Sequence, residues 1–157
     1  MSFRIGLEMR LRGAYLSMHR TFQAEFAPCG VTADQFVVLS LLAEEDGIIQ
    51  RELIRRTCSD ANTITALLRL LERKGLIRRV RHNSDGRARC VHLTPEGRRL
   101  QIELARSSEH LHRRLQEAVP PDELVTLLRC LERVAAAMRP QPQRGEKTIT
   151  LSTRRNS

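Results

Sequence analysis

The hydrophobic positions of this chain recur mostly at intervals of three and four residues, the spacing of an amphipathic α-helix. The clearest stripe follows Asp60 and consists of Ile64, Leu67, Leu68 and Leu71. Comparable stripes predict further helices over residues 3–27, 33–45, 50–56, 95–115 and 121–139. The pattern therefore predicts a mainly α-helical protein.

Capping signals bound several of these helices. Thr32 and Gln35 form a capping box, in which each side chain accepts a hydrogen bond from the other residue's backbone amide. Asp60 and Thr94 are N-cap residue types. Gly75 is suited to the left-handed position that closes the helix after Asp60.

Two runs with strand propensity, residues 76–82 and 87–93, flank the turn-forming sequence Asn-Ser-Asp-Gly over 83–86. This arrangement predicts a β-hairpin, with arginine interleaved on both strands. A two-helix unit, a further helix and an arginine-bearing hairpin form the layout of a winged helix-turn-helix. In that fold one helix enters the major groove of DNA, and the hairpin, or wing, reaches the neighbouring minor groove. The predicted fold class is mainly α with a small β wing.

The charge of the chain favours a polyanionic partner. The 157 residues carry a formal net charge of +9, and residues 69–99 alone hold ten Arg or Lys against three acids. Nucleic acid is the first candidate and an anionic membrane surface the second. No apolar run approaches the length of a membrane span, and the N-terminus does not resemble a signal peptide, so a cytoplasmic protein outside the membrane is expected.

Three motifs then point to a family. They are Leu-Glu-Arg-Lys-Gly-Leu over residues 71–76, Asp-Gly-Arg over 85–87 and Leu-Thr-Pro-Glu-Gly over 93–97. At these separations the chain resembles the MarR-type (multiple antibiotic resistance) transcriptional regulators from about Val31 to Leu100. It departs from that pattern where Cys58 and Ser59 replace a glycine and a hydrophobic residue, and where Ala66 replaces an arginine that often contacts DNA.

The resemblance implies that the helix after Asp60 is the DNA-recognition helix. Its base-contacting roles then fall on Asn62, Thr63 and Thr65, while Arg69 is better suited to a phosphate. Short polar side chains near the start of such a helix can reach base edges in the major groove.

The hairpin supplies the second expected contact. Arg87 at its tip is expected in the minor groove, where negative potential concentrates, with the Asp85 carboxylate holding its guanidinium in place. The further arginines expected to contact DNA, mainly at phosphates, are Arg51, Arg79, Arg81 and Arg89.

The flanking helices suggest a dimer. The expected organisation is an N-terminal dimerisation helix over 1–30, a winged helix-turn-helix domain over 31–97, C-terminal dimerisation helices over 98–139 and a basic tail over 140–157. A homodimer predicts a pseudo-palindromic operator in double-stranded DNA, with half-sites about one helical turn apart.

The resemblance also implies a small aromatic or anionic effector whose binding releases a repressor from DNA. Its expected pocket lies between the first, second and fifth helices and is lined by Tyr15, Met18, His19, Phe22 and Phe36.

Three other functions can be compared with the sequence. A thiol-based redox sensor would need a reactive cysteine early in the first helix, but Cys29 is the earliest, and Cys58, Cys90 and Cys130 are expected to be small buried residues. A non-specific architectural DNA-binding protein is compatible with the charge alone. An enzyme is not expected, because no catalytic or phosphate-binding motif is present, and neither a cofactor nor a metal site is predicted.

Overall fold

A computed structural model describes residues 3–81 and 88–139 of the chain. It divides into two compact units, Met1–Leu115 and Gln116–Ser157. The predicted tail over 140–157 lies outside the described residues.

The first unit begins with α1 (Phe3–Phe26), followed by a 3₁₀ turn η1 (Ala27–Cys29) and α2 (Ala33–Glu44). Between η1 and α2, Gly30 takes a left-handed φ of 67°. The predicted capping box is confirmed at the start of α2: Thr32 Oγ1 accepts from the Gln35 amide at 3.1 Å, and Gln35 Oε1 accepts from the Thr32 amide at 3.2 Å.

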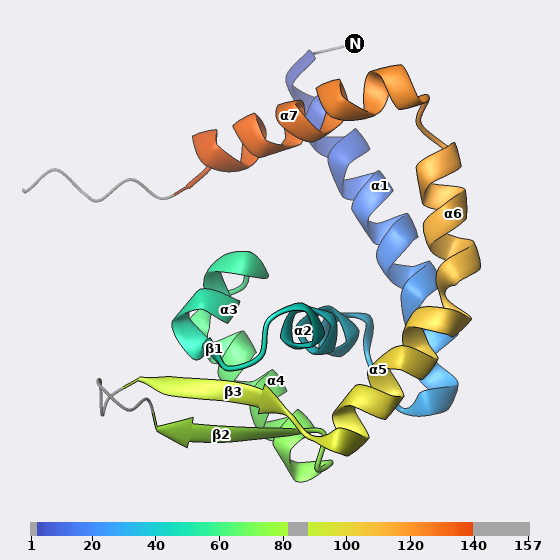
Figure 1. The fold of residues 1–157 in the computed structure, drawn as a ribbon. Helices are drawn as coiled ribbons and strands as arrows, with labels where there is room; N and C mark the ends of the chain where they lie inside the picture. Colours follow the sequence, from blue (N-terminus) through green and yellow to red (C-terminus); the bar gives the residue numbers. More distant parts are fainter. Residues whose placement is uncertain (1–2, 82–87, 140–157) are drawn as a thin grey trace, which may run out of the picture. The chain divides into compact units, whose positions relative to one another are not determined.

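Two short helices and a small sheet follow α2. The helices are α3 (Gln50–Arg56) and α4 (Ala61–Arg73), and the strands are β1 (Ile48–Ile49), β2 (Ile77–Arg81) and β3 (Arg89–Leu93). The three strands are antiparallel neighbours in the order β1-β3-β2, so the predicted pairing of the two hairpin strands is confirmed, and Figure 1 shows β2 and β3 side by side. The predicted turn over 83–86 lies outside the described residues. The pair Ile48 and Val91 joins β1 to the hairpin across more than 40 residues of sequence, a contact that local patterns could not indicate.

A single apolar core holds these elements together. It includes fully buried side chains from α1, α2, α3, α4, β3 and α5, among them Phe26, Leu39, Leu53, Leu68 and Leu104. Burial of such side chains is the main stabilising contribution to folding. The core therefore fixes α3, α4 and the sheet as one structural unit.

The prediction of one continuous helix over 95–115 was wrong. The structure has α5 (Pro95–Ser107) and α6 (Glu109–Glu117), separated at Ser108. The Ser108 hydroxyl donates to the Leu104 carbonyl at 2.8 Å and is completely buried. A serine hydroxyl that bonds back to the preceding turn competes with regular helical hydrogen bonding and favours a bend.

The second unit contains α7 (Pro121–Ala137), which starts with proline in its first turn, as predicted. Its apolar side chains remain largely exposed, including Val125 and Leu128. Within the described residues, no single helix is both long and apolar enough to cross a membrane, although the bent pair 6–29 and 33–44 meets the length and composition limits together.

Candidate nucleic-acid interface

The helix α4 is held at its start by Asp60. The Asp60 carboxylate accepts from the Thr63 amide at 2.9 Å and from the Thr63 hydroxyl at 2.6 Å. These hydrogen bonds from Thr63 hold the pKa of Asp60 below its ordinary value. A carboxylate at this position also complements the positive end of the helix dipole, so the first turn has a defined conformation.

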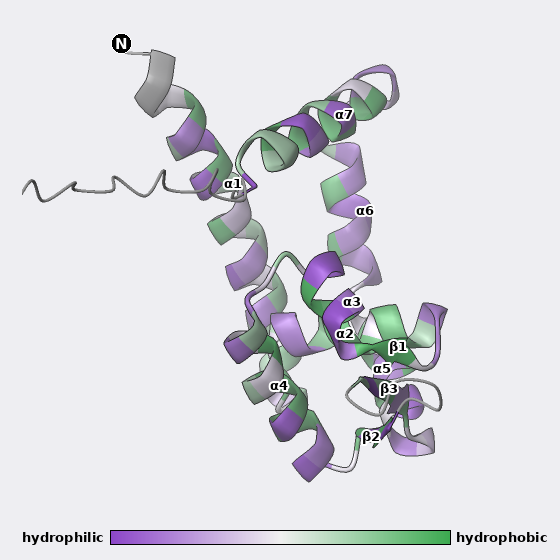
Figure 2. Cartoon of the chain, turned by 90° about the vertical axis from the view of Figure 1, so that its left-hand side faces the viewer, coloured by the Kyte–Doolittle hydropathy of each residue, from purple (hydrophilic) through white to green (hydrophobic). Residues whose placement is uncertain are grey.

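The two sides of α4 differ in character, and Figure 2 shows both hydrophobic and hydrophilic residues around it. The predicted stripe of Ile64, Leu67, Leu68 and Leu71 is buried. The outward side exposes the following residues: Asn62, Thr63, Ala66, Arg69, Leu70 and Arg73. This side is short and polar at its start and basic towards its end, which suits base edges and phosphates respectively.

Thr65 lies at the edge of the outward side, facing α3. It is half-buried, and its hydroxyl accepts a hydrogen bond from Gln50 Nε2 at 3.0 Å. Because Gln50 is the first residue of α3, this bond ties together the two helices of the helix-turn-helix. The sequence pattern placed Thr65 on the outward face but did not indicate its partner.

Arg73 was not singled out from the sequence as a DNA-contacting residue. It is exposed four residues after Arg69, so both lie on the same side of α4. The spacing of four residues between Arg69 and Arg73 is the feature of the sequence that could have identified Arg73.

The hairpin carries two arginines directly opposite each other. Arg81 of β2 is the register partner of Arg89 of β3, and both side chains are exposed. Like charges at directly opposite positions destabilise a sheet, so an anion near this pair is electrostatically favoured. Asp85 and Arg87, the predicted wing-tip residues, lie outside the described residues.

Arg79 has a different environment from Arg81 and Arg89. Its guanidinium contacts Glu72 Oε2 through Nε at 3.0 Å and through Nη2 at 2.5 Å, and only 18% of its side chain is exposed. The same contact with Arg79 holds the pKa of Glu72 below its ordinary value. This ion pair joins α4 to β2. It neutralises the Arg79 guanidinium, which the sequence predicted to contact a phosphate. Arg51, by contrast, is exposed on α3.

The base of the hairpin is attached to the turn between α2 and β1. Asp46 accepts from His92 Nδ1 at 2.9 Å and from the Leu93 amide at 3.3 Å. The hydrogen bond with His92 is the main reason that the pKa of Asp46 lies below its ordinary value. Neither residue stood out in the sequence, because they are 46 positions apart.

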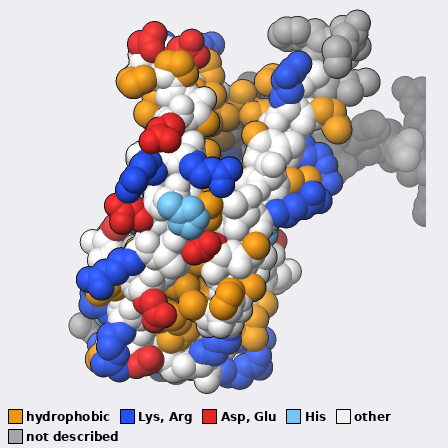
Figure 3. Space-filling model, turned by 90° about the vertical axis from the view of Figure 1, so that its right-hand side faces the viewer, with side chains coloured by type: hydrophobic (Ala, Val, Ile, Leu, Met, Phe, Trp, Pro, Cys, Tyr) orange, Lys and Arg blue, Asp and Glu red, His pale blue; other side chains and the backbone are white. Residues whose placement is uncertain are grey.

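Charge is distributed differently on the side of the molecule where α5 and α6 lie. Figure 3 shows Lys and Arg there interspersed with Asp and Glu side chains. Examples are the pairs of Arg99 with Glu96 and of Arg113 with Glu109. That face thus has no single-sign surface comparable to the arginines of α4 and the hairpin.

Four of the five predicted effector-pocket residues line one cavity of about 140 Å³. They are Met18, His19, Phe22 and Phe36. The fifth, Tyr15, lies beside His19 with ring centroids 5.5 Å apart.

The sequence did not indicate the remaining lining residues of this cavity. These are Phe26, Ala33, His112 and Leu115. His112 lines the cavity because folding places its ring beside that of Phe22, with the ring centroids 4.9 Å apart.

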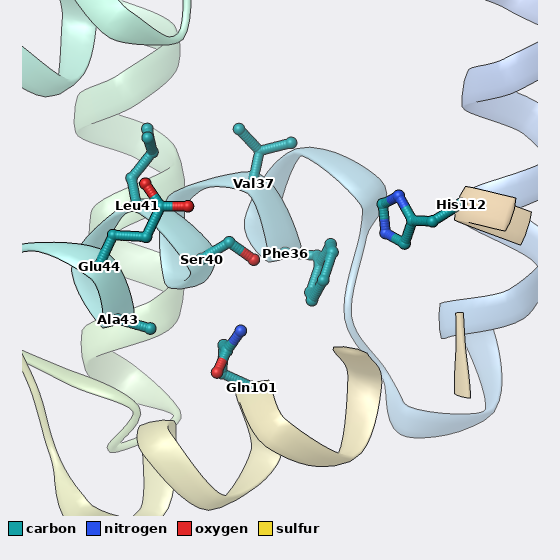
Figure 4. A pocket seen from close by; sticks show the side chains of 8 residues that line it. All are labelled: Phe36, Val37, Ser40, Leu41, Ala43, Glu44, Gln101 and His112. Atoms are coloured by element: carbon teal, nitrogen blue, oxygen red, sulfur yellow. The ribbon is translucent and has the colours of Figure 1, made fainter. Parts of the chain in front are cut away.

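A second cavity, of about 460 Å³, lies between α2 and α5 and is shown in Figure 4. It shares Phe36 and His112 with the smaller cavity, so the two adjoin. Ser40 of α2 and Gln101 of α5 face each other across it and supply polar groups. Within the described ranges there is no group of three or more His, Cys, Asp or Glu placed to hold a metal ion.

Comparisons with known proteins agree with this geometry. The sequence model of the MarR family matches residues 31–88. The HTH-type transcriptional regulator TtmR of Methylorubrum extorquens is 37% identical over 82 residues, which are 52% of this chain and 42% of TtmR. The matched segment thus spans less than half the length of TtmR.

Solved structures match over most of their length. PcaV from Streptomyces coelicolor, complexed with its natural ligand, superposes with a TM-score of 0.71 at 29% identity, covering 87% of this chain and 94% of PcaV. A mutant of MarR from E. coli, complexed with operator DNA, superposes with a TM-score of 0.74 at 27% identity, covering 83% and 94%.

Residues 31–88 are thus similar to the MarR family, and the fold is similar to that of solved MarR-type regulators. The chain has a winged helix-turn-helix fold, as the motifs predicted. In this chain Ala66 is exposed between Asn62 and Arg69 on α4. Its single methyl group can contact only an apolar feature such as a thymine methyl, so it cannot replace an arginine's hydrogen bonds.

The turn before α4 is the second departure from the family pattern. Cys58 takes a left-handed φ of 53° and is exposed, as is Cys130, so the expectation that both are buried was wrong. Cys90 is partly buried. The turn thus keeps a glycine-like conformation although a residue with a Cβ occupies it.

Replacing Cys58 with glycine is expected to stabilise the protein. A non-glycine residue with left-handed φ costs about 1–2 kcal/mol, and the greater chain entropy of glycine in the unfolded state offsets about half of this gain. We expect the free energy of unfolding to rise by about 0.5–1 kcal/mol, measured by urea denaturation. Cys130→Ser, on the exposed surface of α7, is the control and should change stability little; a lower stability for Cys58→Gly would contradict the strain.

Proposed function

We propose that this protein is a MarR-type transcriptional regulator that binds double-stranded DNA sequence-specifically, with α4 in the major groove and the hairpin at the adjacent minor groove. The outward side of α4 carries the proposal, because it exposes Asn62, Thr63 and Arg69 on a helix anchored by the core. The solved complex of a mutant of the similar MarR from E. coli with operator DNA supports a DNA-binding function. Arg51, Arg81 and Arg89 are proposed phosphate contacts.

The tip residues Asp85 and Arg87 are proposed to act in the minor groove, as the sequence predicted. Arg79 is the least suited of the proposed phosphate contacts, because Glu72 already holds its guanidinium. Arg79 would have to break its ion pair with Glu72 before it could contact DNA.

The regulator is further proposed to be a cytoplasmic homodimeric repressor on a pseudo-palindromic operator. Exposed apolar side chains support this in each unit separately: Leu7, Met9 and Tyr15 in α1, and Val125 and Leu128 in α7. Large apolar side chains that are left exposed on a helix can be buried against a partner subunit. The dimerisation segments are accordingly proposed at residues 1–30 and 98–139.

A small aromatic or anionic ligand is proposed to release the protein from DNA. The apolar cavity lined by Met18, Phe22 and Phe36 fits an aromatic ring. His19 also lines it, with Nε2 3.4 Å from Asp34 Oδ1, so an anionic group of the ligand would have to replace Asp34 as the partner of this imidazole. The solved complex of PcaV with its natural ligand supports a ligand-responsive role. Such a ligand must bind the DNA-competent and incompetent states with different affinity. None of these roles requires a catalytic step.

The experiment that tests this function is selection of bound duplexes from a random DNA pool, followed by affinity measurements on the enriched sequence. Asn62→Ala is expected to lose discrimination at one base pair by about tenfold or more, since a good base contact is worth roughly 1–3 kcal/mol. Arg69→Ala is expected to weaken binding to all sequences similarly and to reduce the salt dependence by about one phosphate contact.

Arg113→Gln on α6 is the control for charge and should leave both quantities near the wild-type values. The rival function, a non-specific architectural protein, predicts no enriched sequence and a uniform loss of affinity for every variant. Absence of an enriched sequence, with a folded protein, would therefore overturn the proposal.

A further inference from the structure

The two threonines at the start of α4 both use their hydroxyl groups within the protein, but in opposite senses. Thr63 donates its hydroxyl proton to Asp60 Oδ2 at 2.6 Å. An ionised carboxylate can only accept, and the lowered pKa of Asp60 keeps it ionised at neutral pH. The hydroxyl proton of Thr63 is thus already used in a hydrogen bond, and the lone pairs of its oxygen remain free to accept one.

Thr65 has the reverse arrangement. Its hydroxyl oxygen accepts from Gln50 Nε2 at 3.0 Å. An amide nitrogen has only protons to offer, so the hydroxyl proton of Thr65 remains free to point elsewhere. Gln50 itself reaches this position from the first turn of α3 because the core packs α3 against α4.

We propose that the two threonines present opposite hydrogen-bonding polarity to the DNA, Thr63 as an acceptor and Thr65 as a donor. This inference rests on the proposed function, in which the start of α4 reads base edges. Thr63 then selects a base with an exposed major-groove amino group, cytosine or adenine. Thr65 selects a base with a major-groove acceptor. Guanine fits best, because it presents two acceptors and no donor there. Asp60 and Gln50 become positioning residues that determine specificity without contacting a base.

The test exchanges the polarity at one threonine. In Gln50→Glu the new carboxylate can only accept, so Thr65 must donate to it and present its lone pairs outward. The position that Thr65 reads is first identified with Thr65→Val, which keeps the shape of the side chain but removes the hydroxyl and should abolish the preference there. At that base pair, Gln50→Glu is expected to shift the preference from guanine towards a base with a major-groove amino group, cytosine or adenine, by about tenfold in relative affinity.

A merely structural role for Gln50 would give a different result. The added negative charge would then weaken binding to all four bases at that position equally. That even loss, with an operator still selected by the wild type, would overturn the inference while leaving the proposed function intact. No operator for the wild type would overturn the proposed function itself.

A second variant keeps the test informative if Gln50→Glu fails to fold. Gln50→Met removes the hydrogen bond without adding charge, so the Thr65 hydroxyl can rotate and both donate and accept. The expected result is a preference at that base pair relaxed to within about threefold, with the preference read by Thr63 unchanged. An undiminished guanine preference in Gln50→Met would contradict the role of Gln50. Thr63→Val is the matched control, expected to lose selectivity only at the amino-bearing base.

Discussion

Gly97→Ala is expected to lower the free energy of unfolding by several kcal/mol, about 3–5, because a methyl group at this position has no room. A Cβ on Gly97 would lie 1.9 Å from the backbone oxygen of Leu76. Gly97 lies in the first turn of α5 and is buried against Leu76, which lies between the end of α4 and the start of β2. The clash is with backbone, which cannot move aside as a flexible side chain would.

The surrounding hydrogen bonds explain why the backbone is held so closely there. Thr94 donates its hydroxyl to the Gly75 carbonyl at 2.7 Å and accepts from the Gly97 amide at 3.0 Å. The Thr94 amide donates to the Leu76 carbonyl at 3.1 Å. Thr94 thus joins the end of α4 to the start of α5, and the glycine three residues later permits the approach.

Urea denaturation followed by circular dichroism is the measurement for Gly97→Ala. Gly13→Ala is the matched control, because Gly13 lies within α1 with no atom near its added Cβ. That control is expected to gain about 0.5–1 kcal/mol, since glycine is unfavourable inside a helix. If the free energy of unfolding of Gly97→Ala lies within about 0.5 kcal/mol of the wild-type value, the expected clash with the Leu76 backbone is contradicted.

The double variant Arg81→Gln with Arg89→Gln is expected to weaken DNA binding by about ten- to a hundredfold at fixed salt. If both arginines contact phosphates, the slope of log affinity against log salt should fall by about two contacts. Stability should change in the opposite direction and rise slightly, because the two like charges face each other across the hairpin. Anisotropy titrations of labelled operator over a range of salt, together with denaturation curves, provide both readouts.

The control removes the same number of charges elsewhere. Arg113→Gln with Arg114→Gln changes two exposed arginines on α6, which lies on the far side of α2 from the hairpin in Figure 1. Its salt slope should stay at the wild-type value. Equal losses in both double variants would mean that net charge alone sets the affinity, as expected for a non-specific binder.

Signals within a few residues of each other were sufficient to predict most of the secondary structure. Thr32 with Gln35, Asp60 with Thr63, and Thr94 with Gly97 are pairs three residues apart that form caps whatever else the chain contacts. The stripe from Ile64 to Leu71 likewise identified the buried side of α4. The family motifs extended this local information to the fold and to the candidate DNA-contacting residues.

Tertiary structure alone decided which polar groups are already engaged. Glu72 holds Arg79, Gln50 holds Thr65 and Asp46 holds His92, and nothing in the local pattern connects these partners. Such pairs form only after the core has packed α3 against α4 and placed β1 beside β3, because hydrogen bonds depend on separations of about 3 Å that no periodicity specifies. The sequence by itself predicted a helix after Asp60 that is suited to DNA, and the helix is present as α4. For Thr65, by contrast, which hydrogen-bonding group stays free depended on Gln50, a neighbour that folding brings close.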